Sequence, residues 1–465
     1  MAARRGHSSH SSHSHSTSTR LFTTLPRPTL TFTLPSLHDG LPIDCRLYHP
    51  VSLVASPDSP PWRKHAAIFA HPYAPLGGCY DDGVVDLVAS TLLTQGFLVC
   101  TFNFRGAHGS AGKTSWTSKP ERADYMSVAG FLIHYVHFLD PFRTLAEKSI
   151  ETPPEETPSA DNACEIHLQP PTPQPPVSPK PPVFLSGGYS YGAMITTQLP
   201  SLSAIASLFD SPEVGSYAAE IRARAQHLAE TQNTRLSAER DAIINFQPTS
   251  PRRHVGLRVG GDEEGRSHRE PRRSRSAEFE ESIRQGVAEL VAKTKKAVHL
   301  DKPTGSDGTN EPSSHSYEQH PSVLPLIPGR TAFQPAYLLV SPLQGVITNL
   351  ATMSFPSLSS ISGKAWGRLT AQRNEDAEPD PAPEEEAEAK LVQNPTLAIY
   401  GDNDIFVPVR KLRSWVARLE AVPGTRFRAH EVSSAGHFWA QGNVASILRD
   451  AVRTFASSLL EDAAG

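Results

Sequence analysis

The stretch SGGYSYGAMITTQ, residues 186–198, decides the expected fold. It follows the apolar run VFL and leads into AMITTQL, so a strand is expected to turn sharply into a helix at Ser190. Glycines at positions 188 and 192 avoid a clash where the chain doubles back, which would leave Ser190 strained but exposed at the carboxyl edge of a sheet. The pattern GxSxG is weak evidence alone, and Ser190 could instead be a small residue that fills a turn.

Short apolar runs that end in glycine-rich or polar turns recur on both sides of this stretch. They are HAAIFAHP (65–72), FLVCTFNFRG (97–106), PVFLSGGYS (182–190), AYLLVSPL (336–343), TLAIYGDND (396–404) and RFRAHEVSSAGH (426–437). Helical patterns separate most of them, which predicts a mostly parallel sheet with helices on both faces. Before them, TLTFTL and PIDCRLYHP flank the turn HDG and predict an antiparallel hairpin. The fold class is therefore α/β.

A tail and three insertions interrupt this rhythm. Prolines crowd residues 142–181, where their rings fix φ and remove hydrogen-bond donors, so this segment is expected to be an extended linker. Residues 201–333 hold two helical patterns around a basic centre and form either a lid over the site or a helix at the side of the core. Residues 365–391 read as an acidic, disordered loop. About 250 residues remain, a usual size for one α/β domain.

The predicted organisation follows from these boundaries. The segments are a Ser/His-rich disordered tail (1–26), a first part of the core (27–141), the Pro-rich linker (142–181), the turn around Ser190 with its helix (182–200), the helical and low-complexity insertion (201–333), a second part of the core (334–364), the acidic loop (365–391) and a last part of the core (392–465).

Composition limits the classes of function. A net charge of −4 provides no field that would attract nucleic acid, and no apolar run reaches the roughly 18 residues of a membrane span. The four cysteines lack metal-site spacing and are too few for a disulfide framework, which favours a reducing, cytoplasmic location. The tail is rich in serine and arginine and has no acid before Asp39, as in mitochondrial presequences. A mitochondrial location is therefore the alternative.

A reactive serine needs a base to take its proton and an acid to orient that base. His437 lies in SSAGHFW after the last predicted strand, and the loop IYGDNDIFVP carries Asp402 and Asp404. Each also has an ordinary interpretation: His437 as a surface or capping histidine, and the aspartates as turn residues. His71, His108 and His430 lie in less suitable positions and are weaker candidates for the base.

The chain resembles the α/β-hydrolase superfamily. The segments that carry the resemblance are GYSYG, GDNDIFVP, AGHFW and HPYAPLGG, and they follow one another in the order serine, aspartate, histidine that this superfamily uses. HPYAPLGG together with FNFRGAHGSAG is similar to a branch of esterases and dienelactone-hydrolase-like enzymes. The resemblance covers residues 29–192 and 336–465 and leaves out the insertions.

The resemblance implies roles for particular residues. Ser190 would be the nucleophile and His437 the base, and Asp404 would orient the base because Gly401, Asp404 and Pro408 fit the family's spacing. Asp402 stays the second choice. The oxyanion hole would use the backbone N–H groups of Tyr191 and Tyr73, the latter because Pro72 has no N–H to give. The loop departs from the HGGG form of lipases, and neither a metal nor an organic cofactor is implied.

The expected function is that of a serine hydrolase, carboxylesterase-like, which cleaves a small-molecule ester, thioester or amide through an acyl-enzyme. A serine peptidase or a transacylase would use the same groups. From a different class, the chain could be a non-catalytic scaffold with a hydrolase fold whose insertions bind partner proteins. Arg105 in NFRGAHG is expected to tie its turn to a neighbouring loop rather than to bind an anionic substrate.

Overall fold

One sheet organises the molecule. The computed structural model describes residues 24–53, 62–115, 117–142, 180–245, 285–286, 288, 323–343 and 383–462. Its eight strands lie in the order β1-β2-β4-β3-β5-β6-β7-β8. Their bounds are β1 Leu30–Pro35, β2 Pro42–Tyr48, β3 Ala66–Ala70, β4 Leu98–Phe102, β5 Val183–Tyr189, β6 Gln334–Val340, β7 Thr396–Gly401 and β8 Phe427–Val432.

Strand β2 is antiparallel to both of its neighbours, β1 and β4, and the pairs from β4 onward are parallel. The hairpin predicted around the turn HDG and the mostly parallel sheet are therefore both confirmed. This strand order, with a sharp turn into a helix after β5, is that of the α/β-hydrolase fold. The fold class predicted from the sequence is correct.

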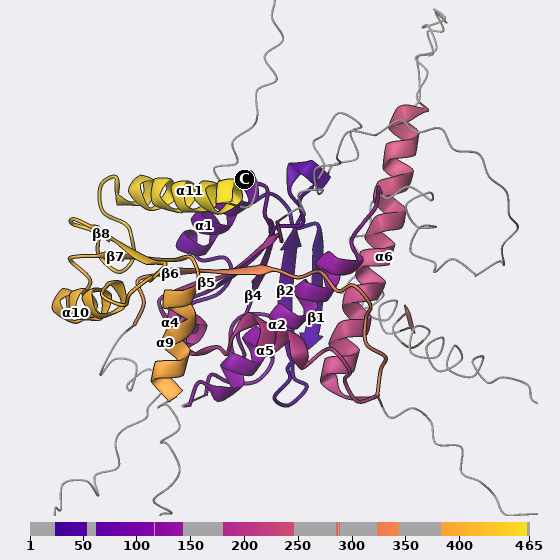
Figure 1. The fold of residues 1–465 in the computed structure, drawn as a ribbon, viewed down its shortest axis with the longest axis horizontal. Helices are drawn as coiled ribbons and strands as arrows, with labels where there is room; N and C mark the ends of the chain where they lie inside the picture. The colour runs from indigo at the N-terminus through magenta and orange to yellow at the C-terminus, as the bar shows by residue number, and fades with distance from the viewer. Residues whose placement is uncertain are drawn as a thin grey trace, which may run out of the picture.

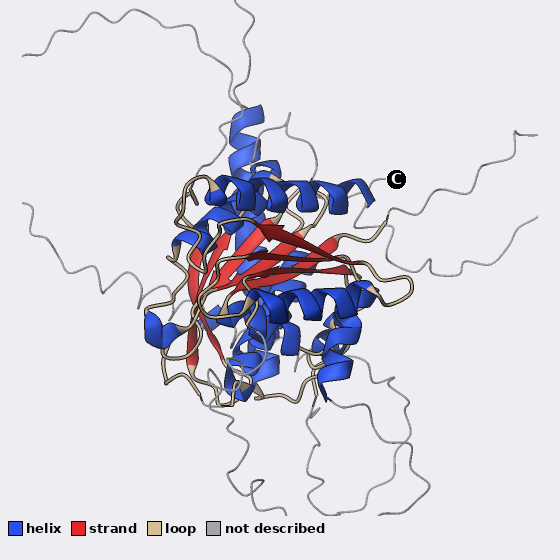
Figure 2. Cartoon of the chain, turned by 90° about the vertical axis from the view of Figure 1, so that its left-hand side faces the viewer, coloured by secondary structure: helices blue, strands red, loops and turns tan. Residues whose placement is uncertain are grey.

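Helices cover both faces of the sheet (Figure 2). Their bounds are α1 Gly83–Thr94, α2 Lys119–Phe138, α4 Tyr191–Gln198, α5 Leu202–Ser207, α6 Tyr217–Ile244, α9 Pro383–Gln393, α10 Val409–Glu420 and α11 Val444–Asp462, with short 3-10 helices η1 Val51–Leu53 and η2 Ala74–Leu76. Helices α1 and α11 lie together on one face, and the others pack on the opposite face or beside β1 (Figure 1).

The central strands are buried on both sides, which explains their continuous apolar sequence. Every residue of β3, β4 and β5 is buried. In β3, Ala66 and Ile68 pack into the cluster that contains α2, whereas Ala67 and Phe69 pack into the cluster with α1 and α11. Because successive side chains of a strand point to opposite faces, each face needs its own helices.

The insertion predicted at 201–333 begins with α5 and α6. Helix α6 packs along α2 beside the β1 edge of the sheet, where Arg224 donates a hydrogen bond of 2.9 Å to the Thr33 carbonyl (Figure 1). Of the second helical pattern, residues 285–286 and 288 are described, and a side chain at Gly286 would meet the His227 ring of α6. The other residues from 246 to 322 lie outside the described ranges, so a lid remains a prediction.

The acidic loop predicted at 365–391 ends in a helix rather than in a loop. Residues 383–391 belong to α9, whose Leu391 is fully buried in the core. Lys390 is also buried, and its Nζ donates hydrogen bonds to the Thr197 and Leu199 carbonyls at the end of α4. The acidic composition pointed to a solvated loop, but burial of these two side chains stabilises the helix. Residues 365–382 and 143–179 lie outside the described ranges.

Two further expectations concern cysteine and membranes. Cys45, Cys79 and Cys100 carry free thiols, and Cys164 lies outside the described residues. In the part of the chain that the structure describes, none of the helices has both the length and the apolar character needed to cross a bilayer.

Candidate active site

The candidate site lies where the parallel strands end. The loops after β3, β5, β7 and β8 all leave the carboxyl edge of the sheet, the edge at which α/β folds place their binding sites. They carry Tyr73, Ser190, Asp404 and His437 respectively. Residues that are distant in the sequence therefore meet at one edge.

Ser190 occupies the sharp turn between β5 and α4. Its φ of 56° and ψ of −111° lie outside the regions that side-chain-bearing residues prefer, so the backbone is strained there. The Ser190 N–H donates a 2.8 Å hydrogen bond to the Val340 carbonyl of the neighbouring strand, which helps to hold this conformation. The turn and the strain predicted at Ser190 are present, but the prediction that Ser190 is exposed is wrong: it is buried, at 5% exposure, because the His437 ring packs against its hydroxyl.

The two glycines that flank Ser190 are required by close backbone packing. A Cβ at Gly188 would lie 2.3 Å from the backbone carbon of Gly192, and a Cβ at Gly192 would lie 2.6 Å from the Ala70 carbonyl oxygen. The first contact lets α4 fold back tightly over β5. The second presses the start of α4 against the end of β3, so the segments that carry Tyr191 and Tyr73 come together.

His437 links the serine to an acid. Its Nε2 lies 2.8 Å from the Ser190 Oγ, and its Nδ1 lies 2.7 Å from the Asp404 Oδ2. Because an ionised carboxylate only accepts hydrogen bonds, the arrangement fits an imidazole protonated at Nδ1. The lone pair of Nε2 then faces the serine hydroxyl, as a general base requires. All three side chains are buried.

The structure separates the two aspartates that the sequence left open. Asp404 Oδ1 accepts hydrogen bonds from the backbone N–H groups of Phe406 and Val407, at 2.8 and 3.1 Å, and this leaves Oδ2 for His437. Asp402 instead accepts a 2.7 Å hydrogen bond from the Ser434 N–H. Asp402 thus fastens the turn that leads to the histidine and does not contact the imidazole.

Two aromatic residues that the sequence reasoning missed hold the histidine loop in place. The Tyr189 hydroxyl donates a 2.8 Å hydrogen bond to the His437 carbonyl, and Trp439 Nε1 donates one of 3.1 Å to the Ser341 hydroxyl. Tyr189 precedes the serine in the motif GYSYG. Its position next to the serine was the only signal in the sequence, and the partner lies 248 residues away.

The two residues whose amides are expected to form an oxyanion hole lie near one another. Tyr191 is the first residue of α4, so its N–H has no acceptor within the helix. Tyr73 directly precedes the 3-10 helix η2 in the loop after β3, and the Tyr73 and Tyr191 rings lie 5.2 Å apart between centroids. The proximity of the rings agrees with the close packing of Gly192 on this loop.

His71 fixes the peptide unit that contains the Tyr73 N–H. Its Nε2 accepts a 2.8 Å hydrogen bond from the Phe104 N–H, so the proton of the ring is on Nδ1, which donates to the Pro72 carbonyl at 2.5 Å. Burial lowers the pKa of His71 to about 4, which keeps the ring neutral at neutral pH. Because C=O and N–H of one trans peptide point in opposite directions, anchoring the Pro72 carbonyl aims the Tyr73 N–H.

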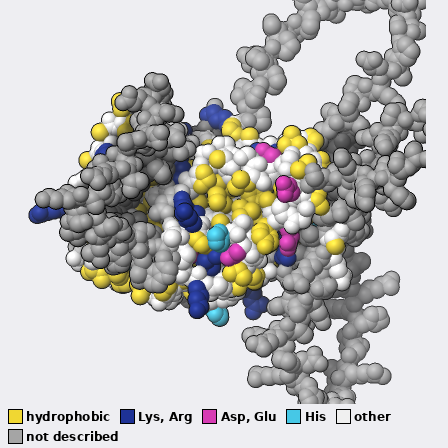
Figure 3. All heavy atoms as spheres, turned by 90° about the horizontal axis from the view of Figure 1, so that it is seen from below, with side chains coloured by type: hydrophobic (Ala, Val, Ile, Leu, Met, Phe, Trp, Pro, Cys, Tyr) yellow, Lys and Arg dark blue, Asp and Glu magenta, His cyan; other side chains and the backbone are white. Residues whose placement is uncertain are grey.

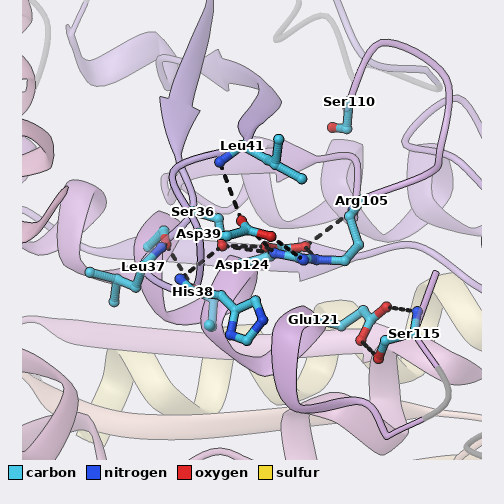
Figure 4. A network of polar contacts seen from close by, with 12 residues as sticks. Ser36, Leu37, His38, Asp39, Leu41, Arg105, Ser110, Ser115, Glu121 and Asp124 are labelled. Carbon is cyan, nitrogen blue, oxygen red and sulfur yellow. Dashed lines mark hydrogen bonds and ion pairs between the residues drawn. The ribbon is translucent and has the colours of Figure 1, made fainter. Parts of the chain in front are cut away.

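Arg105 is a structural residue. Its guanidinium donates to both carboxylate oxygens of Asp124, at 3.0 and 2.7 Å, and to the Asp39 carboxylate at 2.9 Å (Figure 4). Asp124 belongs to α2 and Asp39 to the turn between β1 and β2. The prediction that Arg105 ties its turn to neighbouring segments is confirmed.

No group of three or more His, Cys, Asp or Glu side chains among the described residues is arranged to hold a metal ion. His430, one of the weaker candidates for the base, lies on β8.

Comparisons with known proteins find similar structures without a family match. No family model matches the chain, and no curated protein matches it. An α/β serine hydrolase without a lid from Xanthomonas campestris is 13% identical, with 94% of this chain and 96% of that chain covered and a TM-score of 0.37. An esterase from Pyrococcus furiosus is 10% identical, with 94% and 90% covered and a TM-score of 0.38. A Butyrivibrio proteoclasticus protein with bound ferulic acid is 9% identical, with 92% and 99% covered and a TM-score of 0.34. Values this low do not assign the chain to a family.

Proposed function

We propose that the protein is a serine hydrolase that cleaves a carboxylic ester through an acyl-enzyme, with Ser190 as nucleophile, His437 as general base and Asp404 as the orienting acid. The observation that carries the proposal is the pair of hydrogen bonds at the His437 ring: Nε2 lies 2.8 Å from Ser190 Oγ, which donates to it, and Nδ1 donates to Asp404 at 2.7 Å. A serine hydroxyl is unreactive at neutral pH unless a neighbouring base takes its proton, and this arrangement supplies one.

The reaction proceeds in two halves. Ser190 Oγ attacks the carbonyl carbon of the ester while its proton passes to His437 Nε2. The tetrahedral intermediate then expels the alcohol, which takes the proton from His437, and the acyl group stays on Ser190. Next, water gives a proton to His437 and attacks the acyl carbon. The second tetrahedral intermediate releases the acid, and His437 returns the proton to Ser190 Oγ. The proposed reaction uses no metal ion or organic cofactor.

The supporting groups stabilise the charges that develop during these steps. Asp404 stabilises the imidazolium that forms when His437 takes the proton, and it holds the ring so that Nε2 faces the serine. The N–H groups of Tyr191 and Tyr73 would donate to the negative oxygen of the tetrahedral intermediate. His71 acts as a positioning residue because it fixes the Pro72–Tyr73 peptide. Loss of one oxyanion donor typically lowers kcat by about 100- to 1,000-fold.

A fluorophosphonate probe tests the proposal directly, because it reacts only with an activated serine. The wild-type protein should be labelled, and it should hydrolyse 4-nitrophenyl acetate. The Ser190→Ala variant should do neither, whereas Ser203→Ala, which alters an exposed serine on α5, should behave as the wild type. Equal labelling of wild type and Ser190→Ala would rule out the assigned nucleophile, and folded wild-type protein with neither labelling nor turnover would favour a non-catalytic role.

A further inference from the structure

Exposed hydrophobic side chains gather on the loops that carry the candidate catalytic groups. Leu76 and Ile405 are each 75% exposed, and Phe438 is 61% exposed. These are three of the four most exposed large hydrophobic side chains in the described part of the chain; the other is Leu326. Ile405 directly follows Asp404, and Phe438 directly follows His437. We call these three side chains, Leu76, Ile405 and Phe438, the apolar rim.

The apolar rim flanks Ser190 on both sides. Strand β5, which leads to Ser190, lies between β3 and β6, with β7 and β8 beyond β6. Leu76 is on the loop after β3, whereas Ile405 and Phe438 are on the loops after β7 and β8. With strands about 4.8 Å apart, the loops after β3 and β7 are separated by roughly 14 Å across the sheet. A carbonyl group held at Ser190 would therefore have apolar side chains to either side.

The apolar surface begins at the catalytic ring itself. The half-buried Phe406 ring lies 4.6 Å from the His437 ring and 5.8 Å from the Phe438 ring, measured between centroids. Phe438 in turn lies 5.6 Å from His437. Apolar surface thus extends without a break from the imidazole outward to the exposed Phe438.

Figure 3 views the molecule from below Figure 1, the side on which the turn between β1 and β2 lies. Cys45 in the middle of β2 pairs with Phe102 at the end of the antiparallel strand β4, so β4 ends toward this side, whereas β6 runs nearly across the view of Figure 1. Figure 3 shows hydrophobic side chains gathered in the middle of this side, with charged side chains around them.

Single exposed hydrophobic residues are normal on protein surfaces, but their concentration around a reactive centre marks a binding surface. The rim offers no charge and no hydrogen-bond donor on its side chains, so it can gain free energy only by removing hydrocarbon from water. A chain that starts at the carbonyl carbon on Ser190 is the ligand that this position favours. An acetyl group is too short to cover side chains on the outer loops.

We propose that one side of the apolar rim binds the hydrocarbon chain of the acyl group, so that the substrates are esters of medium-chain aliphatic acids. The inference rests on the proposed function, because it assigns a ligand to the same site. Each methylene group removed from water by the rim strengthens the binding of the transition state, and kcat/KM therefore rises with the length of the acyl chain.

The test compares two esters with the same leaving group, 4-nitrophenyl acetate and 4-nitrophenyl octanoate, at concentrations at which both are monomeric. Wild type should prefer the octanoate. Because the acyl chain leaves the carbonyl carbon in one direction, either Leu76→Ser or Ile405→Ser should lower the octanoate-to-acetate ratio of kcat/KM, and the double variant should lower it about tenfold. Phe438 is left unchanged because its ring packs on His437. Val51→Ser is the matched control: Val51 is 57% exposed and follows β2 at the opposite edge of the sheet, so the ratio should not change.

The outcomes separate the inference from the function on which it rests. If Ser190 is not labelled by fluorophosphonate, the proposed function fails and the inference falls with it. If labelling is intact but the double variant keeps the wild-type ratio, the function stands and the inference is overturned. It is also overturned if the double variant keeps that ratio and loses sedimentation with phosphatidylcholine vesicles that wild type shows, because the rim would then contact a membrane surface.

Discussion

The two oxygens of the Asp404 carboxylate have different partners: Oδ2 lies 2.7 Å from His437 Nδ1 on the loop after β8, and Oδ1 accepts hydrogen bonds from two backbone N–H groups of its own loop. This division fixes which way an amide would lie at the same position. In an Asp404→Asn variant the amide oxygen would stay on the backbone donors of Phe406 and Val407, and the NH₂ group would face His437. Nδ1 would then have to accept, and the proton would move to Nε2.

Asp404→Asn should therefore lower kcat by about 10⁴-fold with the fold intact, because Nε2 could no longer take the serine proton. The measurement is kcat for 4-nitrophenyl acetate together with the rate of fluorophosphonate labelling. Asp402→Asn is the matched control, since Asp402 contacts the Ser433–Ser434 turn instead of the imidazole. It should cost about 1 kcal/mol of stability and leave kcat within tenfold. A larger loss of kcat in Asp402→Asn than in Asp404→Asn would contradict the assignment of the acid.

The two hydrogen bonds of His71, to the Pro72 carbonyl and from the Phe104 N–H, can be removed one at a time. Asparagine can replace one ring nitrogen and glutamine the other. His71→Asn places an N–H donor near the position of Nδ1 and can keep the contact to the Pro72 carbonyl. His71→Gln reaches the position of Nε2 and can keep the contact to the Phe104 N–H. Both variants should lose stability, because each leaves a buried group without its partner.

Only the glutamine variant should lose the orientation of the Tyr73 N–H. We expect kcat of His71→Gln to be about tenfold lower than that of His71→Asn, with little difference in KM, because the oxyanion forms only after the substrate has bound. Steady-state kinetics with 4-nitrophenyl acetate provide the comparison. Equal kcat values at equal stability would show that the Pro72 contact is purely structural.

Much of the candidate site could be predicted because each of its turns is encoded by residues close together in the sequence. The turn at Ser190 follows from apolar runs and glycines within thirteen residues. Asp402 and Asp404 could not be separated, because they lie two residues apart in one turn and only the direction of the backbone N–H groups distinguishes them. The role of His71 was not predictable, since it depends on Phe104, which is 33 residues away.

Helix α9 was wrongly predicted to be part of an acidic loop, and the reason is different. Its sequence is dominated by glutamate and alanine, which is typical of a solvated segment as well as of a helix surface. Tertiary contacts favour the helix over a solvated segment: Leu391 is buried in the core, and Lys390 donates a hydrogen bond at the end of α4. Local composition does not contain that information.

Buried neutral histidines should make the protein less stable in mild acid. Burial lowers the pKa of His65, His71 and His134 to about 4 from the ordinary 6.5. Between pH 6.5 and 4 the unfolded chain therefore binds protons that the native state excludes, and stability falls as the pH is lowered through this window. From pH 6.5 to 5 the loss is about 2 kcal/mol for each such histidine.

Urea unfolding at pH 7 and at pH 5 measures this loss. His65→Asn provides the control, because the asparagine oxygen can accept the Val183 N–H as His65 Nδ1 does, at 3.0 Å, without titrating. Its stability should depend on pH less steeply than that of wild type, by about 2 kcal/mol between the two conditions. The same slope in both proteins would show that His65 takes up a proton as readily in the native state as in the unfolded chain.

The Arg105 network should be the most sensitive ion pair of the fold. Asp124 is fully buried, and in Arg105→Met its carboxylate would lose the guanidinium that neutralises it (Figure 4). Breaking a buried pair in this way typically costs about 3–5 kcal/mol, because the remaining charge stays buried. Arg413→Met is the matched control, since Arg413 pairs with Glu431 at the surface with 54% of its side chain exposed, and it should change stability little.

Urea unfolding at pH 7 compares the two variants. The double variant Arg105→Met/Asp124→Leu should recover part of the lost stability, because it also removes the unpaired charge. If the double variant is no more stable than Arg105→Met, the cost arises from lost packing and not from the buried carboxylate.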